Sequence, residues 1–153
     1  MPAIGRKAPA FTLENQDGEK VRLADFAGHT VVLFAYPKAD TPGCTAQACG
    51  FSEQAPAFDA RGAVVLGISP DAPAALARWK QKKGLAFDLL SDPEHTVLEK
   101  YGAWGEKSMY GKTYMGVIRS HWIIGPDGKV LDEQLKVSPK ASVEKATAFL
   151  ETL

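Results

Sequence analysis

The two cysteines of the chain, Cys44 and Cys49, are its strongest candidates for covalent chemistry. Cys44 follows a short loop after a buried apolar run, a common place for a functional residue in an α/β fold. Thr41 is a candidate N-cap and Pro42 a tolerated early helical residue, so Cys44 is expected in the first turn of a helix. The unpaired N–H groups and partial positive charge of a helix N-terminus favour a thiolate over a thiol. The sequence therefore predicts a nucleophilic sulfur at Cys44.

The five-residue spacing of the cysteines differs from the C-x-x-C pair of disulfide exchangers. In a regular helix this spacing places the two Cα atoms ~8.6 Å apart, whereas a disulfide tolerates about 7 Å at most. If both cysteines are helical when reduced, a bond between them requires local unfolding, which we expect around residues 44–51. Pro56 removes one helical N–H and is expected to interrupt or kink the helix, which would ease this unwinding.

A cation that faces the sulfur would complete such a site. Alternation in a predicted strand over residues 117–124 places Arg119, His121 and Ile123 on one face. An arginine in so apolar a strand needs a partner. A thiolate and a carboxylate are both candidates, and the second would make Arg119 part of a structural ion pair. His121 is expected to pack or hydrogen-bond rather than to act as an acid or base.

Strands and helices that would position these residues alternate along the chain. Two apolar runs without polar alternation, 31–36 (VVLFAY) and 63–69 (AVVLGIS), predict strands buried on both faces. Asp17-Gly18 predicts an N-terminal β-hairpin with a type I′ turn. The other predicted strands are 87–90, 117–124 and 130–137. One predicted helix begins near residue 43, and the others span 71–83, 94–101 and 139–150. This order predicts an α/β three-layer sandwich around a mixed central β-sheet.

Composition is typical of one globular domain over residues 1–153, with 45% hydrophobic and 24% charged residues. Eighteen basic and eighteen acidic residues leave no excess positive charge, so we expect no nucleic-acid partner. The longest apolar runs are far shorter than the ~20 residues that cross a bilayer, and residues 1–11 contain no apolar signal segment. We therefore expect a cytoplasmic protein that has no membrane partner.

The segment 36–51, YPKADTPGCTAQACGF, resembles the active-site segment of peroxiredoxins, and in particular their Q-type or bacterioferritin comigratory protein branch. The family pattern P-x-x-x-T-x-x-C is met by Pro37, Thr41 and Cys44. Further matches cover nearly the whole chain: 65–70 (VLGISP), 89–93 (LLSDP), 101–107 (YGAWGEK), 110–116 (YGKTYMG) and Arg119-Ser120. The resemblance implies a thioredoxin-like fold and a monomeric peroxidase that uses cysteine alone, with no metal, haem or other cofactor.

The resemblance also implies a role for each matching residue. Cys44 would be the peroxidatic cysteine, which attacks the O–O bond of a hydroperoxide and becomes a sulfenic acid. The Thr41 hydroxyl would hydrogen-bond the sulfur and the peroxide, Pro37 would shield the site from water, and Arg119 would stabilise the thiolate. Cys49 would be the resolving cysteine, which forms an intramolecular disulfide with Cys44. Thioredoxin or a similar dithiol protein would then reduce that disulfide.

Other interpretations of the same residues exist. The cysteines could be buried structural thiols, although the motif argues against this. A zinc site would need two more ligands, and His29, His95 and His121 are scattered without ligand spacing. A thioredoxin-like disulfide exchanger without a peroxide step is the competing enzyme. A holdase or redox-sensing partner is the non-catalytic alternative.

Overall fold

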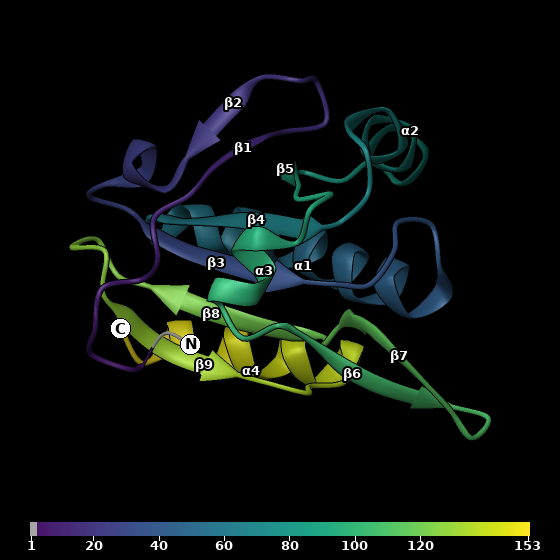
Figure 1. Cartoon of the computed structure of the whole chain (residues 1–153). Helices are drawn as coiled ribbons and strands as arrows, with labels where there is room; N and C mark the ends of the chain where they lie inside the picture. The colour runs from purple at the N-terminus through teal and green to yellow at the C-terminus, as the bar shows by residue number, and fades with distance from the viewer. Residues whose placement is uncertain (1–2) are drawn as a thin grey trace.

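A seven-stranded mixed sheet forms the middle layer of the protein (Figure 1). The computed structural model describes residues 3–153. The strands of this sheet are β1 (Thr12–Glu14), β2 (Lys20–Arg22), β3 (Thr30–Ala35), β4 (Ala63–Ser69), β5 (Asp88–Ser91), β8 (Ser120–Ile124) and β9 (Val130–Gln134). They lie in the order β2-β1-β5-β4-β3-β8-β9. Strands β3, β4 and β5 are parallel, and the outer strands pair antiparallel.

Helices cover both faces of this sheet. They are α1 (Pro42–Ala60), α2 (Pro73–Lys83), α3 (Thr96–Lys100) and α4 (Pro139–Glu151), and a 3₁₀ turn, η1, spans Leu23–Phe26. Figure 1 shows α1 and α4 behind the sheet and α3 in front of it. The first core cluster joins α1, α2 and α4 to one face, and a second cluster packs α3 and the N-terminal segment on the other. The predicted α/β three-layer sandwich is confirmed.

The two apolar runs occupy the centre of the sheet, as predicted. Every residue of β3 is buried, and β4 is buried except for the half-buried Val64. These strands pair with each other in parallel, from Thr30 beside Ala63 to Ala35 beside Ile68. Because both faces are covered by helices, hydrophobic side chains are favourable at every position and no alternation is needed.

The turn of the N-terminal hairpin differs from the prediction. β1 and β2 do pair, but five residues separate Glu14 from its partner Lys20, so the type I′ turn at Asp17-Gly18 is wrong. Asn15 organises the longer loop, because its Oδ1 accepts hydrogen bonds from the backbone N–H groups of Asp17 (2.9 Å) and Glu19 (3.0 Å). These bonds add to a backbone turn, in which Gly18 N–H donates to Asn15 O (3.0 Å).

A second hairpin was not predicted. It consists of β6 (Trp104–Met109) and β7 (Lys112–Val117), which pair across Tyr110 and Gly111. Both turn residues have positive φ angles, 53° and 77°, as a two-residue type I′ turn requires. Most of this hairpin is partly or fully exposed, so its sequence lacks the alternation that marks a half-buried strand.

The remaining corrections concern element ends. The predicted strand 117–124 is two elements, because β7 ends at Val117 and β8 begins at Ser120. The two residues between these strands form backbone hydrogen bonds with other segments: Ile118 N–H donates to Ala103 O (2.7 Å), and Arg119 O accepts from Val137 N–H (3.0 Å). α1 continues through Pro56, so the predicted interruption is wrong, and a kink there stays a prediction. Gly84 closes α2 with a left-handed φ of 60° directly after the predicted helix end at residue 83.

Candidate active site

The loop between β3 and α1 places Cys44 at the third residue of α1. Thr41 is the N-cap, with extended φ and ψ of −102° and 154°, and Pro42 is the first helical residue, as predicted. The Thr41 hydroxyl donates to the Lys38 carbonyl oxygen (2.7 Å). Ala39 N–H donates to Asp71 Oδ2 (2.8 Å), which ties the loop to the segment after β4. Cys44 therefore lies among the unpaired N–H groups of the first helical turn.

Arg119, in the segment between β7 and β8, contacts the Cys44 sulfur. Its Nη2 lies 3.4 Å from Cys44 Sγ, across 75 residues of chain, and its Nη1 donates to Gln47 Oε1 at 2.7 Å. Of the two partners that the sequence left open for Arg119, the structure therefore provides the thiol. A guanidinium beside the sulfur and the N-terminus of α1 both favour a negative charge there.

The absence of a side chain at Gly43 allows this approach. A Cβ at this position would lie 3.1 Å from Arg119 Nη2 and 3.6 Å from Pro139 Cγ. The first contact is tighter than ordinary van der Waals packing. Arg119 therefore lies against the backbone of the first turn of α1, and α4 encloses the same point through Pro139.

Lys107 of β6 places a second cation near the site. Burial lowers its pKa, and the positive charge of Arg119 lowers it further, whereas the negative charge of Cys44 raises it. The side chain is half-buried, and its Nζ lies 6.0 Å from the centre of the Tyr114 ring. The hairpin that the sequence did not reveal thus contributes positive charge close to the sulfur.

Both cysteines are helical and free, because they lie in the uninterrupted α1. Only 1% of Cys44 is exposed, whereas Pro37, Thr41 and Arg119 are each partly exposed. Cys49 is half-buried and packs against the same core cluster. Because both residues are helical, a disulfide between them requires a turn of α1 to unwind.

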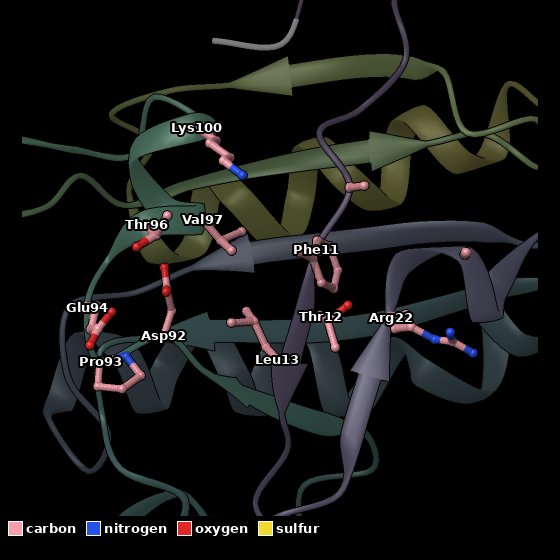
Figure 2. Close-up of a pocket in the computed structure, with 12 residues that line it drawn as sticks. Phe11, Thr12, Leu13, Arg22, Asp92, Pro93, Glu94, Thr96, Val97 and Lys100 are labelled. Atoms are coloured by element: carbon pink, nitrogen blue, oxygen red, sulfur yellow. The ribbon is translucent and has the colours of Figure 1, made fainter.

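A separate pocket of about 590 Å³ lies between β1, β2 and the segment that leads into α3 (Figure 2). Phe11 and Leu13 form part of it, with Asp92 and Lys100 nearby. The Asp92 carboxylate accepts a hydrogen bond from Leu98 N–H (2.8 Å), so it supports α3. None of the five residues that the sequence singled out as a site lines this pocket.

Comparison with known proteins identifies the family. Residues 4–132 match the AhpC/TSA family. The protein belongs to the AhpC/TSA family. The peroxiredoxin Bcp of Escherichia coli (strain K12) is 51% identical over 126 residues, which cover 82% of this chain and 81% of that protein. The putative peroxiredoxin bcp of Haemophilus influenzae is 51% identical over 151 residues, covering 99% and 97% of the two chains.

Solved peroxiredoxin structures have the same fold. Peroxidoxin BcpB of Mycobacterium tuberculosis superposes with a TM-score of 0.88 at 35% identity, covering 100% of this chain and 99% of that one. The bacterioferritin comigratory protein of Xanthomonas campestris, described with alkyl peroxide reduction activity, gives a TM-score of 0.87 at 33% identity over 93% and 90% of the two chains. The chain is therefore a peroxiredoxin of the Bcp/PrxQ type and an enzyme of the peroxidase class.

The structure also adds residues to the peroxiredoxin site that sequence reasoning missed. Gln47, Gly43 and Lys107 all contact or face the Cys44–Arg119 pair. The spacing of Gln47, three residues after Cys44 on the same helix, was the one local signal available.

Within residues 3–153 no helix is long and apolar enough to cross a membrane.

Proposed function

We propose that this peroxiredoxin reduces hydroperoxides through Cys44. The thiolate sulfur attacks one peroxide oxygen, so an S–O bond forms as the O–O bond breaks. Cys44 becomes a sulfenic acid, and the released oxygen takes up a proton and leaves as water or an alcohol. The observation that carries this proposal is the 3.4 Å contact between Arg119 Nη2 and Cys44 Sγ at the start of α1.

Arg119 has two functions in this step. Its positive charge stabilises the thiolate before attack, and its N–H groups stabilise the negative charge that develops on the leaving oxygen. Thr41 lies one helical turn before Cys44 and would hydrogen-bond the peroxide after its hydroxyl turns away from the Lys38 carbonyl. Pro37, half-buried after β3, shields the loop from water.

Cys49 acts as the resolving cysteine in the second step. Its thiol sulfur attacks the sulfenic acid sulfur, so a disulfide forms and water leaves. Because both cysteines are in α1, the helix must unwind between them first. A dithiol protein such as thioredoxin then supplies two electrons and two protons, which restore both thiols.

Intact mass and thiol counts after one equivalent of hydrogen peroxide test both roles. The wild type is expected to lose two hydrogens, and Cys49→Ser to retain one added oxygen. Cys44→Ser is expected to remain unmodified under the same conditions. A wild type that does not react with peroxide but exchanges disulfides with thioredoxin would instead establish the competing disulfide exchanger.

A further inference from the structure

A line of buried polar groups continues from the guanidinium of Arg119 into the core. Gln47, Ser142 and His121 are each 0% exposed. Gln47 Nε2 lies 3.0 Å from Ser142 Oγ, and Ser142 Oγ lies 2.7 Å from His121 Nδ1. At the far end, His121 Nε2 lies 4.0 Å from Asp132 Oδ2. The line therefore connects α1, α4, β8 and β9 behind the reactive sulfur.

The donors and acceptors of this line are assigned from its guanidinium end. Arg119 can only donate, so the Gln47 amide must turn its oxygen to Arg119 and its NH₂ group to Ser142. The Ser142 oxygen then accepts, and we assign its proton to His121 Nδ1, because within the described residues the hydroxyl has no other acceptor. The ring proton therefore lies on Nε2, which faces the Asp132 carboxylate. Among the described residues Nε2 has no hydrogen-bond partner, so the line of hydrogen bonds ends at this ring. In the three bonds before it each group donates to the next, an arrangement in which successive bonds strengthen one another.

We propose that Ser142, with its proton directed by His121, is a positioning residue of this peroxiredoxin. It holds the Gln47 amide in the orientation that gives Arg119 an acceptor, and it thereby keeps Nη2 beside Cys44 Sγ. The inference rests on the proposed function only in taking Cys44 as the reacting sulfur.

A neutral His121 is required by this arrangement. Burial lowers the pKa of His121 to about 4, so the ring has one proton at neutral pH. A second proton would turn Nδ1 into a donor, and the Ser142 proton would lose its acceptor. The groups that act on the ring come from three elements: Phe51 of α1 packs against it, Ser142 of α4 hydrogen-bonds it, and the charges of Asp132 of β9 and Lys145 of α4 influence its pKa.

The test compares Ser142→Ala with Ser142→Thr, which keeps the hydroxyl. Stopped-flow mixing with hydrogen peroxide should show a second-order rate constant about fivefold lower in Ser142→Ala, because Gln47 loses one buried hydrogen bond, and recovery in Ser142→Thr. Thr147→Val is the matched control, since within the described chain the buried Thr147 hydroxyl of the same helix has no hydrogen-bond partner. It should react at the wild-type rate.

A double-mutant cycle separates positioning from a merely structural role. Gln47→Met removes the amide, so adding Ser142→Ala to it should cause no further loss of rate. Thermal melts of each variant measure stability independently. If folded Ser142→Ala retains the wild-type rate, or if the two substitutions slow the reaction additively, the proposal is wrong. Failure of the proposed function is distinct from these outcomes, because the wild type itself would then not react.

Discussion

Gly43→Ala should separate the reactivity of this enzyme from its stability. The Gly43 backbone does not have a positive φ, so alanine is compatible with the helix. Its Cβ, however, would lie 3.1 Å from Arg119 Nη2 and 3.6 Å from Pro139 Cγ. Arg119 is the flexible neighbour of the two, so the guanidinium is the group that must move.

The size of the effect follows from the distances. An ordinary contact begins at 3.4 Å, so Nη2 must retreat by about 0.3 Å, while Gln47 holds Nη1 at 2.7 Å. The contact between Nη2 and Cys44 Sγ, already 3.4 Å long, is weakened as the guanidinium pivots. A hydrogen bond to a charged group contributes about 1.5–3 kcal/mol, and losing roughly 1 kcal/mol of it slows the reaction about fivefold. Alanine is favoured over glycine in a helix interior by up to about 1 kcal/mol, so stability should not fall.

Two measurements on one protein check this prediction. Stopped-flow mixing with hydrogen peroxide should give a rate constant about fivefold lower than that of the wild type, while the thermal midpoint stays equal or rises. Ala46→Gly is the matched control, because Ala46 is exposed two residues after Cys44 on the same helix. It should lower the midpoint and leave the rate unchanged. A Gly43→Ala enzyme with the wild-type rate would refute the idea that the Arg119 contact sets the reactivity of the sulfur.

Three further predictions concern packing, oxidation and pH. Gly50→Ala would place a Cβ 2.8 Å from Val143 Cγ2, so the urea midpoint should fall by the equivalent of about 1–3 kcal/mol and recover in the double variant with Val143→Ala. Trp79 Nε1 donates to Thr45 Oγ1 (3.2 Å), so unwinding of α1 on oxidation should change tryptophan emission, and Trp79→Phe should lose that change while the other two tryptophans remain. Burial lowers the pKa of His121 from 6.5 to about 4, so the unfolded chain binds the proton first as pH falls. Relative to His121→Asn, the free energy of unfolding of the wild type should therefore fall by on the order of 3 kcal/mol as the pH is lowered from 6.5 to about 4. Urea titrations at a series of pH values measure this change.

Local patterns predicted the parts of the fold that are buried from both sides. The apolar runs of β3 and β4 and the helix start at Thr41 are recognisable within a few residues of sequence. The face on which Arg119 lies was also predicted, although Arg119 precedes β8: Arg119 contacts Cys44 of α1, and Ile123 packs in the cluster with α1 and α4, whereas Trp122 packs on the other face. These features depend on short-range periodicity, which a sequence displays directly.

The rest depends on contacts between distant segments. The β6–β7 hairpin is largely exposed and has tyrosine rather than asparagine in its turn, so neither alternation nor turn composition marks it. The contact between Gly43 and Arg119, and the hydrogen bond between Gln47 and Ser142, join residues more than 70 positions apart. Such contacts exist only after the segment before β8 and helix α4 have both packed against α1.

The position of Gln47 links the two halves of the proposed cycle. It lies between Cys44 and Cys49 on α1, so the unwinding that lets the disulfide form also withdraws its amide from Arg119 and Ser142. In that cycle the oxidised enzyme would lose the acceptor that holds Arg119 near the sulfur, at the stage when no thiolate needs stabilising. Reduction would let the helix close again, and the return of Gln47 would re-form the line of hydrogen bonds from Arg119 to Ser142. The refolding of a single turn of α1 would thus restore the geometry of the site before the next peroxide is attacked.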